Sequence, residues 1–210
     1  MDALKKFSNL FILLICLALG SCVPQVNTFT QVALINAPEN NKVKGLAAQL
    51  ERAVKRNLAP GEVGFVPASR VRYQEQARDL RGSQAVSQGA IVARVFGAEY
   101  SALISAPIYE RSVFTFRAFR SEKRSVTTQV QLEVILVDAA SADVTATYTS
   151  QLYVRTRLES TKEDLPDKED DPDLEELLQK GLGDIGRPLA TDLAVIAGYA
   201  KANQAVPLQP

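Results

Sequence analysis

SVTTQVQLEVILVD (Ser125–Asp138) is the stretch that decides the fold of this 210-residue chain. Apolar residues alternate with polar ones along it, and five share one parity: Val126, Val130, Leu132, Val134 and Leu136. Such alternation is typical of a strand with one buried face. The small polar turn AASAD (139–143) follows, so the stretch predicts one strand of an antiparallel pair.

Two more extended runs flank this strand. YSALISAPIYERSVFTFRAF (Tyr100–Phe119) precedes it after the turn RSEKR (120–124), and VTATYTSQLYVRTRL (Val144–Leu158) follows it. Sequential extended runs joined by short turns become antiparallel neighbours, so the three runs predict a three-stranded meander. Pro107 interrupts the first run and predicts a bend, a bulge or an edge position there, because proline cannot donate to the ladder.

The rest of the chain alternates strands and helices. Helical spacing and stop signals predict, in order, a strand at 29–36, a helix at 43–58, a strand at 62–67 and helices at 69–80 and 84–96. After the meander, they predict C-terminal helices at 173–182 and 186–200. The second C-terminal helix is expected to begin near Pro188. We therefore predict one α/β domain over 29–200, a mixed sheet of about five strands flanked by about four helices, followed by a tail at 201–210.

ESTKEDLPDKEDDPD (Glu159–Asp173) is acidic and poor in large apolar residues. This composition predicts an exposed or disordered acidic loop. Calcium binding is the alternative for so many carboxylates, but the regular D-x-D-x-D-G spacing is absent, and we expect no metal site.

The N-terminus has the pattern of a secretory signal. Lys5 and Lys6 precede the apolar run Phe11–Leu19, which is shorter than the roughly 20 residues that a membrane-spanning helix needs. Leu19-Gly20-Ser21-Cys22 then resembles the lipobox of bacterial lipoproteins, in which the cysteine is diacylated and becomes the mature N-terminus. The alternative is an ordinary signal peptide with a chance cysteine.

The lipobox resemblance implies a signal peptide at 1–21, a lipidated Cys22 and a short tether at 22–28. Val23 stands where enteric lipoproteins retained at the inner membrane have Asp, so the resemblance implies the outer membrane, with the domain facing the periplasm. Two acyl chains would anchor the protein stably.

Composition limits the chemistry that is available. The chain has no histidine and two cysteines, of which Cys16 lies in the signal and Cys22 would be lipidated. Histidine-based triads, free thiols and the usual zinc sites are therefore ruled out for the mature chain, and we expect no catalysis and no cofactor. Positive and negative side chains number 24 each, so no net field favours nucleic acid as a partner.

Three segments carry a resemblance to a superfamily of outer-membrane lipoproteins: GFVPASRV (64–71), ARVFGAEYSALI (93–104) and VQLEVILVDAASADVTATYT (130–149). The superfamily contains LpoB-like activators of penicillin-binding proteins, CsgG-like curli secretion subunits and the amino-terminal domain of the Tol system's periplasmic protein. The resemblance implies a membrane-anchored binding protein, an accessory factor in cell-wall synthesis or envelope assembly, whose partner could be a peptidoglycan synthase. The alternative is a subunit of an oligomeric secretion channel. The resemblance is also compatible with a homo-oligomer.

The chain departs from both the activators and the channel subunits. The activators have a long disordered spacer, whereas the tether here is a few residues long and reaches little beyond the membrane. The channel subunits need two membrane-spanning hairpins, whereas only VFTFRAF (113–119) with its flanks could serve here, and it contains Arg117.

A basic aromatic hairpin is the predicted contact surface. Its candidate residues are Arg111, Phe114, Phe116, Arg117, Phe119, Arg120, Lys123 and Arg124. Exposed arginine and aromatic side chains are enriched in protein interfaces. The alternative is that Phe114 and Phe116, which share a face, pack under the helices while the arginines are merely solvated.

Overall fold

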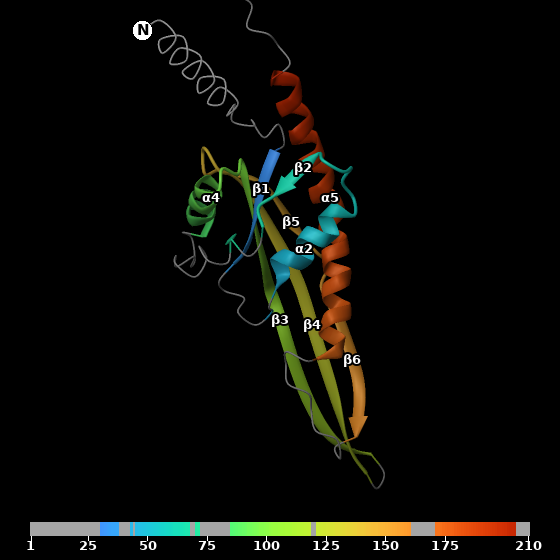
Figure 1. Cartoon of the computed structure of the whole chain (residues 1–210). Helices are drawn as coiled ribbons and strands as arrows, with labels where there is room; N and C mark the ends of the chain where they lie inside the picture. Colours follow the sequence, from blue (N-terminus) through green and yellow to red (C-terminus); the bar gives the residue numbers. More distant parts are fainter. Residues whose placement is uncertain are drawn as a thin grey trace, which may run out of the picture.

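The computed structural model describes residues 30–37, 43, 45–67, 70–71, 85–118, 121–160 and 171–204. Its elements are β1 (Thr30–Asn36), α2 (Leu46–Lys55), β2 (Val63–Phe65), α4 (Ala85–Val95), β3 (Tyr100–Ala118), β4 (Ser121–Asp138), β5 (Val144–Thr149), β6 (Tyr153–Ser160) and α5 (Pro172–Gln204). Within these ranges six strands form one mixed sheet that carries three helices, which confirms the predicted single-domain α/β class (Figure 1). None of the described helices has both the length and the apolar content needed to cross a bilayer.

The sheet combines a parallel and an antiparallel part. Its order is β2-β1-β3-β4-β5, with β6 also paired to β4. β1 runs parallel to β2 and β3, whereas β4 is antiparallel to β3, β5 and β6. The register of β3 against β4 shifts between Ser105 and Ile108, which confirms the irregularity predicted at Pro107.

The predicted third strand of the meander is in fact two strands. β5 pairs with β4 near Glu133, and β6 pairs with it farther along, from Val130 to Lys123. At the break between them, the side-chain oxygen of Ser150 accepts a hydrogen bond from the Leu132 amide at 2.9 Å, and the Ser150 amide donates to the Leu132 carbonyl at 2.9 Å. This local bonding replaces the regular ladder and ends β5.

Apolar side chains form a core on each face of the sheet. One core joins α2 and α5 to the sheet through fully buried residues such as Leu50, Leu132 and Leu189. The other joins α4 to the opposite face around Ile35 and Leu103. The predicted helices at 43–58 and 84–96 are confirmed as α2 and α4, whereas the helix predicted at 69–80 lies mostly outside the described residues.

The prediction of two C-terminal helices is wrong. α5 is one helix of 33 residues, and Pro188 lies inside it. A proline inside a helix removes one backbone hydrogen bond and costs about 3 kcal/mol. Ile185, Leu189 and Leu193 are fully buried on both sides of that position, and their packing against the sheet offsets the cost.

The molecule is long and narrow because β3 and β4 continue beyond the helix-covered part (Figure 1). We call the narrow part of the sheet the arm; it comprises Ile108–Ala118 of β3, Ser121–Gln131 of β4 and all of β6, and the beginning of α5 covers its inner face near the root. The start of β1 and the end of α5 both lie at the opposite end of the molecule from the arm's tip (Figure 1).

Candidate interaction surface on the arm

The strand pairing gives the arm two faces. Phe114, Ser125 and Leu158 form one row across β3, β4 and β6, and Ser112, Thr127 and Thr156 form the next row on the same face. Because side chains alternate along a strand, the residues between them belong to the other face. We call the first the outer face. The second, which contacts α5, is the inner face; it carries Arg111, Arg124, Thr128, Arg155, Arg157 and Glu159.

The outer face exposes large apolar side chains near the tip. Phe114 is 69% exposed and stacks on Phe116 with a centroid separation of 6.2 Å. On β6, Leu158 is 66% exposed and Val154 is 53% exposed. The two phenylalanines therefore do not pack under the helices, and the alternative that predicted this is wrong.

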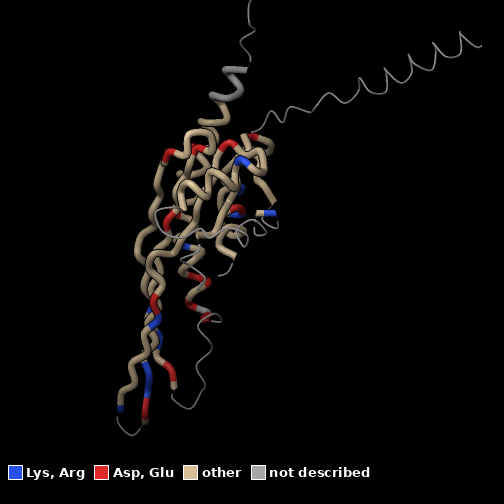
Figure 2. Tube along the Cα trace, turned by 90° about the vertical axis from the view of Figure 1, so that its left-hand side faces the viewer, with Lys and Arg blue, Asp and Glu red and all other residues tan. Residues whose placement is uncertain are grey.

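The predicted cations divide between the two faces. Lys123 is exposed on the outer face near the tip; Arg117 is exposed there too, but strand alternation places it on the inner face. Arg111 and Arg124 instead point to the inner face, where their side chains are 5% and 10% exposed. Phe119, Arg120 and Cys22 lie outside the described residues. Figure 2 shows basic and acidic residues mixed along the arm rather than separated into patches of one sign.

Arg111 and Arg124 belong to a network that we call the clamp, which is buried around Asp171 and exposed at Arg155 and Glu176. It pairs Arg111, Arg124, Arg155 and Arg157 with Glu159, Asp171, Asp173 and Glu176. The acids come from the end of β6, from Asp171 and from the beginning of α5, so three of the four lie within the predicted acidic loop 159–173. The clamp thereby fixes the first turn of α5 against the inner face of the arm.

Asp171 is the centre of the clamp. One carboxylate oxygen accepts hydrogen bonds from Thr128 at 2.6 Å and lies 3.5 Å from Arg111 Nε, and the other accepts from Arg157 Nη1 at 2.7 Å. The Asp173 amide also donates to it at 3.1 Å. Burial alone would raise the pKa of Asp171, but these donors and the nearby guanidinium outweigh it, so the pKa lies below its usual value.

Arg157 links Asp171 to the other acids. Its Nη1 atom donates to Asp173 at 2.6 Å, and its Nε atom donates to Glu159 at 2.5 Å. Arg124 donates to the other oxygen of Glu159 at 3.1 Å. Burial opposes the charge on Glu159, yet the two arginines hold its pKa below the usual range. The predicted exposed loop is thus wrong at both ends, since Glu159 and Asp171 are buried partners, while residues 161–170 lie outside the described residues.

Two tyrosines continue the contact between α5 and the sheet. Tyr153 of β6 donates to Asp184 at 2.8 Å, and Tyr148 of β5 donates to Asp192 at 2.6 Å. Burial and the hydrogen bond to Asp192 raise the pKa of Tyr148 well above its usual value. α5 is therefore bonded to the strands at three successive places, the clamp, Tyr153 and Tyr148, and these bonds make the root of the arm rigid.

The clamp holds structural elements together. The Asp171 carboxylate accepts hydrogen bonds from guanidinium and hydroxyl donors, and the described residues hold no group of acidic side chains suited to a metal ion. Sequence reasoning missed Thr128, Glu159, Asp171 and Asp173. One sequence feature could have indicated the acids. Four arginines lie at alternating strand positions, and buried arginines require acidic partners nearby because buried charges are paired.

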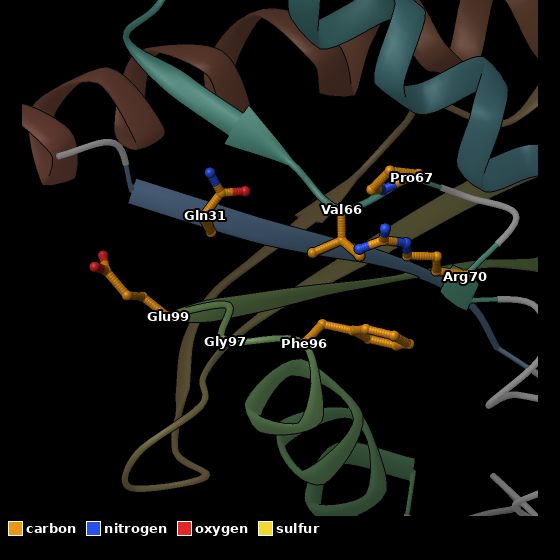
Figure 3. Close-up of a pocket in the computed structure, with 7 residues that line it drawn as sticks. All are labelled: Gln31, Val66, Pro67, Arg70, Phe96, Gly97 and Glu99. Carbon is orange, nitrogen blue, oxygen red and sulfur yellow. The ribbon is translucent and has the colours of Figure 1, made fainter. Parts of the chain in front are cut away.

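A pocket of about 310 Å³ lies at the other end of the sheet. Its lining includes Gln31 of β1, Arg70, and the turn Phe96–Glu99 between α4 and β3. Figure 3 shows the Arg70 side chain directed toward Val66 while the Glu99 carboxylate points away from the other labelled side chains. These groups do not converge on a point where a ligand could be held, so the pocket is not a candidate site.

No protein-family model matches the chain, and no curated protein matches it. Among solved structures, lipoprotein GNA1162 from Neisseria meningitidis is similar at 14% identity, covering 80% of this chain and 99% of that one, with a TM-score of 0.40. The PelC dodecamer from Paraburkholderia phytofirmans is similar at 13% identity, over 80% and 92% of the two chains, with a TM-score of 0.39. The LpoB C-terminal domain from Salmonella enterica is similar at 14% identity, over 62% and 86%, with a TM-score of 0.34.

Proposed function

We propose that this chain is a lipid-anchored protein of the bacterial envelope that binds another envelope protein through the outer face of its arm and catalyses no reaction. The most specific form of the proposal is an accessory factor in cell-wall synthesis or envelope assembly. The observation that carries it is the Phe114 side chain, exposed on the outer face and stacked on Phe116, with the exposed Lys123 paired to Phe116 across the ladder. Exposed aromatics with adjacent cations have the composition of interface hot spots.

The direction of the arm supports the same proposal. The tether enters at Thr30, and β3 runs from Tyr100, beside β1, for 19 residues toward the tip. At about 3.3 Å per residue the tip lies about 60 Å from that end. A tether from Cys22 to Thr30 spans at most about 30 Å. The folded arm would thus provide the reach that the activators obtain from a disordered spacer.

A subunit of an oligomeric channel is less well supported. β3 and β4 are longer than the 9–11 residues that a transmembrane strand needs. However, the inner face carries the buried clamp and is covered by α5, so lipid and lumen could not each take one face of the hairpin.

Co-purification of the lipidated protein from native membranes in mild detergent tests the proposal. We expect one envelope protein to accompany the natural chain, and we expect Phe114→Ser with Phe116→Ser to release it. Val195→Ser on α5 is a matched control, since Val195 is 51% exposed but lies far from the tip along α5. A ring made of this chain alone, or an unchanged partner in the double variant, would contradict the proposal.

The anchor is tested separately by mass spectrometry of the mature protein. The natural chain should begin at Cys22 and carry the added mass of acyl chains. Cys22→Ser should lack that mass and move from the membrane fraction to the soluble fraction, because a single change removes the attachment point. An unmodified N-terminus in the natural chain would refute lipid anchoring.

A further inference from the structure

β6 is an edge strand that lacks the usual protection. It pairs with β4 from Tyr153 to Ser160, and within the described ranges no second strand pairs with its other side. Native proteins protect such edges with proline, lysine, bulges or charged side chains, because an open edge is a template for another strand. β6 has no proline or lysine, and its pairing with β4 has no register shift.

The charged side chains of β6 do not protect its open edge. Arg155, Arg157 and Glu159 lie on the inner face, where the clamp pairs them. The outer face of β6 therefore presents Val154, Thr156 and Leu158, two exposed apolar side chains around a hydroxyl. The edge is left regular, extended and apolar on one side.

The sequence of this edge is symmetric. Val154-Arg155-Thr156-Arg157-Leu158 reads apolar, Arg, Thr, Arg, apolar in both directions. We propose that β6 pairs antiparallel with β6 of a second copy of this chain, with the two-fold axis at Thr156. Such an interface is isologous, so Val154 of each copy meets Leu158 of the other, and the two threonines face each other. Threonine pairs are favourable across antiparallel strands, as in the 2.9 Å contact between the Thr156 and Thr127 hydroxyls within the chain, and the Val154–Leu158 pairs would bury exposed apolar surface.

The clamp is what permits two arginine-bearing edges to meet. In this register Arg155 lies opposite Arg157 of the second copy, and like charges directly opposite are destabilising when uncompensated. Here each arginine already bonds to acids of its own chain: Arg155 to Asp173 and Glu176, and Arg157 to Asp171 and Asp173. With four arginines and four acids the clamp is neutral, so the approach of a second copy meets no net repulsion.

α5 leaves room for the second copy. It begins at the level of Arg157, beside the axis, and then passes Tyr153 and Tyr148 on its way back from the tip. The two-fold axis reverses this direction in the other copy, so the two helices diverge from the axis instead of crossing. The two arms would join into one six-stranded sheet. Phe114 on β3 would stay accessible to a partner, so the proposed dimer does not depend on the proposed function.

Cysteine cross-linking tests the register. The full chain with Cys16→Ser and Cys22→Ser has no other thiol, so Thr156→Cys would be its sole cysteine. Opposed residues on adjacent antiparallel strands have Cβ atoms about 4.5–5.5 Å apart, within reach of a short thiol cross-linker. We expect a covalent dimer from Thr156→Cys and none from Ser112→Cys, which lies in the same row but two strands from the axis. Cross-linking between these two variants in a mixture would show head-to-tail pairing and overturn the proposal.

A charge exchange tests the interface without a covalent bond. V154K/L158K places like charges in both symmetric pairs, and V154K/L158E places opposite charges there. We expect the first to raise the dimer dissociation constant about tenfold over the second, measured by analytical ultracentrifugation in detergent. Both positions are exposed in the monomer, so far-UV circular dichroism should show the same fold for both variants. Equal dissociation constants for the two variants, or a natural chain that stays monomeric at every concentration, would overturn the proposal.

Discussion

Asp171 joins three parts of the molecule through one carboxylate: β4 through Thr128, β6 through Arg157 and β3 through Arg111. Loss of this buried charge would be costly, because Arg111 and Arg157 would stay buried with one acidic partner fewer. At this scale the inner face of the arm is held by paired charges, whereas the outer face exposes Phe114, Val154 and Leu158.

Asp171→Ala should destabilise the protein by about 3 kcal/mol, since it leaves Arg157 and Arg111 without their shared partner. Urea unfolding followed by circular dichroism measures the change. Glu51→Gln is the control, because the pair of Glu51 with Lys55 is at the surface and contributes about 0.5 kcal/mol or less. Equal losses in the two variants would mean that the clamp does not hold the arm.

Stability should also fall in acid. The pKa values of Asp171 and Glu159 in the folded protein lie below the unfolded values of about 3.9 and 4.3. Their contribution is therefore present above those unfolded values and is lost as pH falls through the folded pKa values. Urea unfolding at a series of pH values between 6 and 2 should give a steeper loss for the natural chain than for a chain with Asp171→Asn and Glu159→Gln. Parallel curves would contradict this assignment.

At the scale of elements, α5 is the main support of the sheet. It packs on α2 at a close crossing, where a Cβ atom on Gly186 would lie 3.0 Å from Ala53 Cβ and 3.2 Å from the Ala53 carbonyl carbon. Only a residue without a side chain keeps this distance without a shift of the backbone. Farther toward the N-terminus, α5 is bonded to the strands through its acids.

Gly186→Val should destabilise the protein by about 1–3 kcal/mol, because the branched side chain would force α2 and α5 apart. Gly183→Ala is a control on the same helix: nothing lies within 4 Å of its Cβ position, so it should be stabilising by up to about 1 kcal/mol through helix propensity. Thermal unfolding of both variants measures the difference. A destabilising Gly183→Ala, or a neutral Gly186→Val, would contradict the packing described here.

Local patterns predicted most of these elements. The parity of Val126 to Leu136 identified β4 and its buried face, and Pro107 marked the bulge in β3. Pro188 misled the prediction for α5, because burial on both sides of it overrides a local helix signal. The prediction placed Arg111 and Arg124 on the same contact surface as Phe114, since alternation alone does not tell which face a distant helix will cover. That depended on Asp171 and Asp173, which local periodicity cannot connect to Arg111 and Arg157.

At the scale of the whole molecule, the body and the arm have separate tasks. β1 begins and α5 ends at one end of the molecule (Figure 1), whereas the exposed Phe114 lies near the end of β3, toward the tip of the arm. The clamp and the tyrosine bonds make the arm a rigid extension of the sheet. In the proposed function, the lipid anchor sets the position of one end and the outer face of the arm meets the partner at the other.

Photo-cross-linking in cells, one residue at a time along β3 from Ser112 to Arg117, tests this account most directly. If the outer face binds the partner, cross-links should appear at Ser112, Phe114 and Phe116 and be absent at Val113 and Thr115, because successive side chains point to opposite faces. Cross-links of equal yield at all of these positions, or cross-links confined to the inner-face positions, would contradict the account.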